Sequence, residues 1–283
     1  MHKRNTFSNG ATMNGKKISN TGESQEDLRK IYNPDGSQLR KAQLRMLEML
    51  KFLDKICTEN NITYWLDSGT LLGAARHGGF IPWDDDTDIC MPLKDAERFK
   101  KLMLTQNLSD DFVLQCRETD DGYYGAWYVL RDTKSEYMQN SKLHQKRKYR
   151  GLQIDIFMVE EKSFYPFFWF AEKVQRNLID KHLYKNDYWS QTKWGLVLVY
   201  HIQQLLILLF RLISPKRDFI RMPYGVLWKK RNIKDIFPLR KIMFEGHEFN
   251  APSNTENYLT SIYGEWEKLP DKIQTHNVEV VFL

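Results

Sequence analysis

Residues 65–89 read WLDSGTLLGAARHGGFIPWDDDTDI, and this stretch decides the fold and the site that the sequence predicts. It holds a dense acidic run made of Asp84, Asp85, Asp86 and Asp88. Carboxylates crowded in this way repel one another, and the crowding is unfavourable unless a cation neutralises it. We expect a strand over residues 86–91, in which Asp86 and Asp88 point to the same face while Asp84 lies beside them.

The oxygen ligands of this run favour Mg²⁺ or Mn²⁺, which in turn bind the diphosphate of a nucleotide. Asp155 is the candidate for a third carboxylate, because it is an acid in an otherwise apolar segment. Upstream, Gly69 and Thr70 form a small turn whose backbone N–H groups can face a phosphate. The sequence therefore predicts that Asp86, Asp88 and Asp155 bind a metal next to a phosphate-binding turn.

Four other residues are candidates for roles around this metal site. Arg76 and His77 follow the Gly-Thr turn, and Arg131 ends an expected strand, so each is a candidate phosphate contact. Each of them can equally be a structural or surface residue. Asp84 or Asp155 is the candidate general base that accepts the proton of an attacking hydroxyl.

Three other interpretations of the acidic run fit the sequence less well than a metal-phosphate site does. An EF-hand loop that begins at Asp84 needs Gly at its sixth position and Glu at its twelfth, whereas these positions are Ile89 and Asp95. A solvated acidic turn is disfavoured by the apolar residues around the run. The DxD motif of a metal-dependent glycosyltransferase stays open.

The hydrophobic pattern places this motif inside a strand-rich core over residues 62–160, behind a leading amphipathic helix. Helices are expected at residues 39–60, 71–76 and 94–105, and strands at 62–66, 86–91, 112–116, 126–131 and 152–159. We expect residues 1–37 to be a mobile polar extension without a secretory signal, and residues 38–283 to form a single domain.

Beyond the core, residues 161–240 are rich in aromatic and basic side chains, and residues 241–283 form a closing segment. The most hydrophobic stretch, at 194–213, is interrupted by His201, Gln204 and Arg211, so it falls short of the roughly 18 apolar residues that span a bilayer. Three interpretations remain: a core or interface helix, a helix lying in the plane of a membrane, and a transmembrane helix.

The charge distribution suits a protein that handles phosphates. The 283-residue chain carries a formal net charge of +6, with basic residues gathered at 142–150 and 193–231 around the acidic run. No nucleic-acid-binding module is apparent, so we expect no nucleic-acid partner. The chain has 3 cysteines without metal-ligand or disulfide spacing, which points to a reducing, cytoplasmic compartment.

These motifs resemble the LicD family, whose eukaryotic relatives include fukutin and fukutin-related protein. The resemblance rests on residues 64–89, on 151–157 and, more loosely, on 258–276. It departs from the family pattern at Met158, where the family often has proline. The resemblance implies an α/β (α+β) fold with a nucleotidyltransferase-like core sheet, flanking helices and a helical, apolar C-terminal insertion.

The resemblance also implies an activity, and residue by residue it carries the metal pair onto Asp86 and Asp88 and the third carboxylate onto Asp155. We expect transfer of a phospho-substituted group from a CDP-linked donor, with CDP-choline the first candidate. The expected acceptor is a hydroxyl of a cell-surface glycan or of its lipid-linked precursor, reached at the inner face of the membrane. The alternatives are a glycosyltransferase or nucleotidyltransferase with another nucleotide donor, and a non-catalytic membrane or assembly protein.

Overall fold

The computed structural model covers the predicted core and much of the rest of the chain. It describes residues 24–123, 125–138, 142–145, 147–161, 167, 170, 173, 189–220, 229–270, 272–273, 275 and 279–283. The first part of the expected extension and most of the aromatic stretch at 162–188 lie outside these residues.

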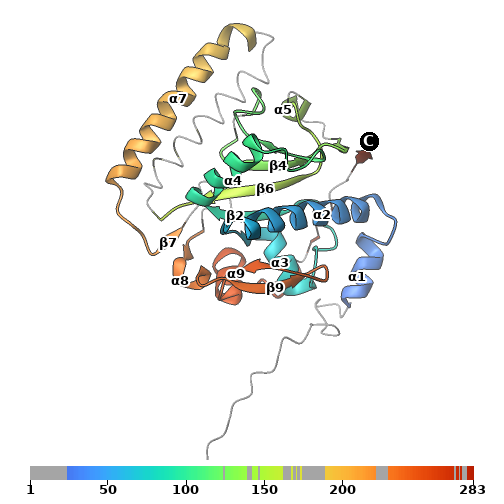
Figure 1. Cartoon of the computed structure of the whole chain (residues 1–283). Coiled ribbons are helices and arrows are strands. Elements are labelled where there is room, and N and C mark those ends of the chain that lie inside the picture. Colours follow the sequence, from blue (N-terminus) through green and yellow to red (C-terminus); the bar gives the residue numbers. More distant parts are fainter. Residues whose placement is uncertain are drawn as a thin grey trace, which may run out of the picture.

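A mixed five-stranded sheet forms the centre of the molecule (Figure 1), which confirms the α/β class. Its strand order is β1 (Trp65–Leu66), β2 (Asp88–Pro92), β6 (Gln153–Val159), β4 (Tyr128–Asp132) and β3 (Phe112–Gln115). The pair β2 and β6 is parallel, and the other neighbours are antiparallel. The acidic motif and the Asp155 segment therefore lie side by side at the middle of the sheet.

Side-chain alternation gives the central strands one apolar and one acidic face. Ile89, Ile154 and Ile156 are fully buried on one face, while Asp88 and Asp155 alternate with them and point to the other. The helix α2 (Gln38–Glu59) packs against β6, and its Met46 and Leu50 are fully buried. The hydrophobic core thus fixes which face is left for the carboxylates.

Two shorter helices connect the strands of this core. α3 (Ser68–His77) follows β1 and ends at Gly78, whose positive φ of 69° suits a left-handed helix cap. α4 (Leu93–Thr105) begins directly after β2 and buries Ala96 and Phe99. The expected helices at 39–60, 71–76 and 94–105 are confirmed, with bounds shifted by a few residues.

The expectation that residues 1–37 form a mobile extension is wrong for residues 24–37, because these residues are part of the fold. The helix α1 (Gln25–Tyr32) begins with a reciprocal capping box between Ser24 and Asp27, and its Leu28 is fully buried. The Asn33 side chain then donates a hydrogen bond of 2.6 Å to Gln43 of α2. The sequence pattern missed this helix because it has only one buried apolar residue.

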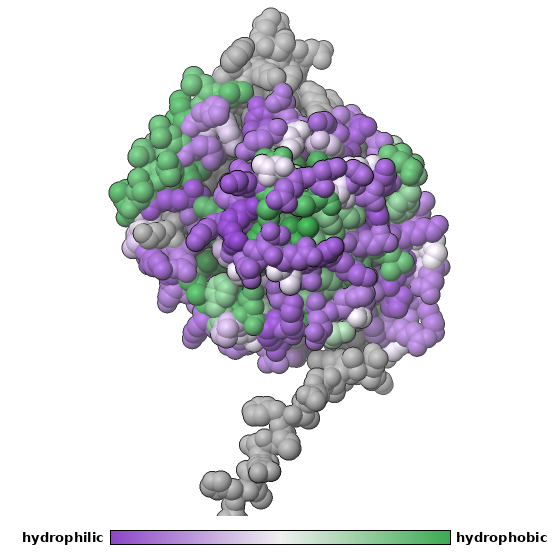
Figure 2. Space-filling model, viewed as in Figure 1, coloured by the Kyte–Doolittle hydropathy of each residue, from purple (hydrophilic) through white to green (hydrophobic). Residues whose placement is uncertain are grey.

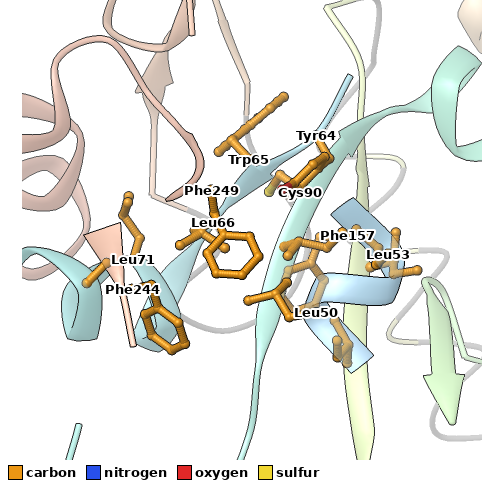
Figure 3. Close-up of a cluster of buried hydrophobic side chains, with 14 of the residues drawn as sticks. Leu50, Leu53, Tyr64, Trp65, Leu66, Leu71, Cys90, Phe157, Phe244 and Phe249 are labelled. Carbon is orange, nitrogen blue, oxygen red and sulfur yellow. The ribbon is translucent and has the colours of Figure 1, made fainter. Parts of the chain in front are cut away.

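A C-terminal hairpin completes the core. β9 (Arg240–Phe244) and β10 (His247–Ala251) are joined by Glu245 and Gly246, which both have positive φ, as a tight hairpin turn requires. Phe244 and Phe249 pack into the same cluster as Leu66 and Leu71 (Figure 3). The closing segment is therefore an integral part of the domain.

The remaining elements are short or peripheral, except for the long helix α7 (Trp189–Ile213). They are β5 (Ser135–Tyr137), α5 (Lys142–Gln145), β7 (Phe219–Ile220), β8 (Arg231–Asn232), α8 (Ile233–Ile236), α9 (Thr255–Tyr263) and β11 (Val280–Phe282). Among the described residues, no helix is long and apolar enough to cross a bilayer.

Candidate functional site

The centre of the site is a pair of neighbouring carboxylates on parallel strands. Asp88 at the start of β2 is in register with Asp155 of β6, and the Asp155 N–H donates a hydrogen bond of 2.8 Å to the carbonyl of Thr87. Burial raises the pKa of Asp88 well above its usual range, and repulsion from Asp86 and Asp155 adds to this effect. Burial likewise raises the pKa of Asp155 to about 6, although Arg131 opposes the shift.

Asp84 and Asp86 bring two more carboxylates to this pair. Burial raises the pKa of Asp84 well above its usual range, and the charges of Asp86 and Asp85 act in the same direction. The expected strand at 86–91 was too long, however, because β2 begins only at Asp88. Asp86 therefore approaches the pair from the preceding loop, as an exposed residue, and does not share a strand face with Asp88.

The first turn of α3 lies directly against these carboxylates. A Cβ atom added to Gly69 would lie 2.7 Å from Asp84 Oδ2 and 4.0 Å from Asp86 Oδ1. The hydroxyl of Thr70 accepts a hydrogen bond of 2.8 Å from the Asp88 N–H, which fixes the start of β2. The structure thus brings Gly69 and Thr70 together with the acidic run, and the Thr70 hydroxyl is used to position Asp88.

A buried cluster beneath α3 was missed by the sequence analysis. Asp67 is fully buried and accepts hydrogen bonds of 2.5 Å from the Tyr258 hydroxyl and 3.0 Å from the Ser68 hydroxyl. The guanidinium of Arg231 lies 3.7 Å from Asp67 Oδ2, the oxygen that also accepts the hydrogen bond from Ser68. The available signal was an acid at the end of an apolar strand, but its partners are too far away in the sequence to be recognised.

The loop that carries the acidic run is held by α2 and by the C-terminal hairpin. Gln43 is fully buried and donates to the carbonyls of Ile81 (3.3 Å) and Asp84 (2.9 Å). Arg40 makes a bidentate ion pair of 3.1 and 2.7 Å with Glu245, which also accepts a bond of 3.1 Å from the Phe80 N–H. These contacts orient the acidic run before any ligand binds.

Arg76 and His77 make their hydrogen bonds with the protein itself. Arg76 Nη1 donates to the carbonyls of Trp266 (3.0 Å) and Lys268 (3.1 Å), and its Nε donates to His77 Nε2 at 2.9 Å. His77 Nδ1 contacts the side-chain oxygen of Gln25, so the ring is a neutral donor at Nδ1. Burial, assisted by Arg76, lowers the pKa of His77 to about 3. A phosphate contact by either residue stays a prediction.

Arg131 lies next to the carboxylate pair and has an unused donor. It is fully buried, and it donates to Gln115 (2.8 Å) and to the carbonyl of Gly151 (2.9 Å). Its Nη2 is buried and finds no hydrogen-bond acceptor in the described part of the chain. Burial, with repulsion from Arg147, lowers the pKa of Arg131 to about 10, while attraction to Asp155 opposes this. Arg131 is thus a cation beside the acidic site whose Nη2 has no hydrogen-bond acceptor among the described residues.

The donor set suits a hard divalent cation. Within the described ranges, no three Asp, Glu, His or Cys side chains converge closely enough to form a ready metal cage. Yet Asp84, Asp88 and Asp155 are carboxylates whose pKa values are raised by burial and by their acidic neighbours. A cation that brings these oxygens together would relieve their repulsion, and oxygen donors favour Mg²⁺ or Mn²⁺ over softer metals.

Comparison with known proteins agrees with the geometry. Residues 61–186 match the family described as "LicD/FKTN/FKRP, nucleotidyltransferase domain". Lipopolysaccharide cholinephosphotransferase LicD of Haemophilus influenzae is 24% identical over 268 residues, which cover 87% of this chain and 98% of that protein. Ribitol 5-phosphate transferase FKRP of Homo sapiens is 40% identical over 55 residues, which cover 19% of this chain and 11% of that protein. The resemblance seen in the motifs is confirmed, because a LicD family domain matches residues 61–186 and the chain is similar to a LicD protein over most of its length.

Proposed function

We propose that this protein transfers phosphocholine from CDP-choline to a hydroxyl of a cell-surface glycan or of its lipid-linked precursor. The match of residues 61–186 to the LicD family supports a LicD-like phosphotransferase, and the named relatives are a cholinephosphotransferase and a ribitol 5-phosphate transferase. The observation that carries the proposal is the in-register pair Asp88 and Asp155, with Asp84 and Asp86 gathered beside Gly69. Such a site binds a diphosphate through a cation.

The metal in this proposal is Mg²⁺ or Mn²⁺, held by Asp86, Asp88 and Asp155. A divalent cation neutralises the charge of the diphosphate and of the leaving phosphate, which is the main requirement of phosphoryl transfer. The protein supplies the positioning: α2 and the C-terminal hairpin hold the acidic run, and Thr70 fixes the first residue of β2.

The transfer step needs a base and an in-line hydroxyl. The acceptor oxygen attacks the phosphorus that bears choline, a new P–O bond forms, and the bond to the CMP oxygen breaks. Asp155 or Asp84 accepts the hydroxyl proton as the general base. CMP leaves with its phosphate dianion.

Arg131 is proposed to bind a phosphate oxygen through its buried Nη2. Arg147 also has a buried Nε with no acceptor in the described segments, and it lies close enough to repel Arg131. Two neighbouring cations with unused N–H groups suit a phosphate, whose oxygens accept several charge-assisted hydrogen bonds.

Donor binding tests this proposal most simply. We would measure Mg²⁺-dependent thermal stabilisation with CDP-choline, CDP-ribitol, CDP-glycerol, UDP-sugars and GDP-mannose, using wild type and Asp88→Asn. Stabilisation by a CDP-linked donor that is lost in Asp88→Asn supports the proposal. Stabilisation by a UDP- or GDP-sugar alone favours the glycosyltransferase alternative. If no donor stabilises the protein, the proposed function is contradicted.

We place the proposed reaction at the inner face of the membrane, because a lipid-linked acceptor would be presented there. The relative from Haemophilus influenzae is named for lipopolysaccharide, which is a lipid-linked glycan. We propose no nucleic-acid partner.

A further inference from the structure

The helix α7 presents its most apolar side to solvent. Five large side chains, spaced alternately four and three residues apart, form what we call the outer stripe: Leu198, Ile202, Leu205, Leu209 and Leu212. Their exposed fractions are 61%, 49%, 57%, 48% and 72%. This spacing keeps all five on one side of a helix. Figure 2 shows the apolar patch at the upper left, where α7 lies in Figure 1.

The opposite side of α7 faces the protein and is more polar than the outer stripe. Ile207 is buried there, while Gln203 and Arg211 are half-buried. Arg211 Nε lies 2.7 and 2.8 Å from the two carboxylate oxygens of Glu160, directly after β6. An ordinary surface helix is oriented the other way, with its apolar side inward. The ion pair therefore fixes an orientation in which a large apolar surface is left for a partner.

The charges around α7 indicate what kind of partner this is. The helix contains no Asp or Glu, and its charged residues are Lys193 and Arg211 alone. Three exposed cations, Arg217, Lys229 and Lys230, follow it, and they outnumber the exposed acid Asp218. A second copy of the helix would normally be aligned by charges of both signs along the helix, and α7 itself carries no acidic residue. An apolar stripe bordered by cations is complementary to an anionic lipid surface.

We propose that the outer stripe of α7 inserts into the interfacial layer of an anionic bilayer, with the helix axis parallel to the membrane. Leu205 and Leu209 lie at the centre of the inserted surface, and Lys229 and Lys230 contact the headgroups. The presentation of a lipid-linked acceptor by that bilayer rests on the proposed function, whereas lipid binding itself does not.

Vesicle sedimentation at low salt tests this inference without donor or acceptor. Wild-type protein should bind phosphatidylglycerol-containing vesicles at least tenfold more tightly than pure phosphatidylcholine vesicles. The double variant Leu205→Gln/Leu209→Gln should bind the anionic vesicles at least tenfold more weakly. A matched control, Leu44→Gln/Leu104→Gln, changes leucines that are 44% and 41% exposed on α2 and α4, and it should bind like wild type.

Three outcomes overturn the inference. The first is that wild type does not sediment with anionic vesicles, and the second is that the Leu205→Gln/Leu209→Gln protein binds them as tightly as wild type does. Alternatively, sedimentation equilibrium shows a dimer that the same double variant abolishes, in which case a second copy covers the stripe. Circular dichroism melting confirms that each variant is folded, and CMP release in solution separates a failure of lipid binding from a failure of the proposed activity.

Discussion

Replacing Gly69 by alanine tests whether the first turn of α3 sets the position of the acidic run. The added Cβ would lie 2.7 Å from Asp84 Oδ2, whereas ordinary contacts begin at 3.4 Å, so the carboxylate must move by about 0.7 Å. The obstacle is the end of a flexible side chain, and Ala favours a helix by about 1 kcal/mol over Gly. We therefore expect the free energy of unfolding to change by less than about 1 kcal/mol.

The same displacement should strongly affect catalysis. Misplacing a catalytic group by about 1 Å lowers rates by up to roughly 100-fold. We expect kcat/KM for CMP release from the donor to fall about 10- to 100-fold, which corresponds to about 1.4 to 2.7 kcal/mol of transition-state stabilisation. The assay follows CMP by chromatography at saturating Mg²⁺, with soluble acceptor and no vesicles.

A second glycine-to-alanine substitution, in α7, serves as the matched control. Gly195→Ala places a methyl group where no atom lies within 4 Å, so it should leave CMP release unchanged. Wild-type kcat/KM in a folded Gly69→Ala protein would contradict this prediction, because the position of Asp84 would then have no bearing on the reaction.

Three further predictions concern single contacts. Tyr258→Phe removes the hydroxyl that donates to Asp67 and accepts from Trp65 Nε1 at 3.2 Å, so denaturant unfolding should show a loss of roughly 1–3 kcal/mol; an unchanged stability would contradict the buried cluster. His77 has a folded pKa of about 3 through burial, below its unfolded value of about 6.5, so the folded state loses stability as pH falls from 6.5 towards 3. Between pH 7 and 5 wild type should lose roughly 2 kcal/mol more than His77→Gln, and parallel pH profiles would exclude this role. Asp155→Asn removes one negative charge from a crowded site, so it should raise the melting temperature of the metal-free protein and abolish Mg²⁺-dependent stabilisation. A lower melting temperature without metal, or Mg²⁺-dependent stabilisation that persists, would contradict the proposed site.

Local patterns singled out the carboxylates that the structure brings together. An acid inside an apolar strand is rare enough to single out Asp155, and strand alternation alone places it on the face opposite Ile154 and Ile156. The parallel pairing with Asp88 was not visible in the sequence, since register depends on the crossover between the two strands.

Long-range contacts account for most of what was missed. The acidic loop is held by Arg40 and Glu245, which are 205 positions apart, and no spacing rule connects them. Asp86 was assigned to a strand from its alternating neighbours, but the pairing with β6 begins only at Asp88. Only Phe244, Phe249 and Ala251 are buried in the two strands of the hairpin at 240–251, so its period-two pattern was too weak to recognise.

We propose that the clustered carboxylates catalyse a metal-dependent phospho-transfer. The most direct test is the rate of CMP release from CDP-choline with Mg²⁺ or with EDTA, compared among wild type, Asp88→Asn and Asp110→Asn. Asp110 is exposed and lies outside the site, so its variant matches the loss of charge alone. We expect release that needs Mg²⁺, persists in Asp110→Asn and falls at least 100-fold in Asp88→Asn. Release that continues in EDTA, or in folded Asp88→Asn protein, would contradict it.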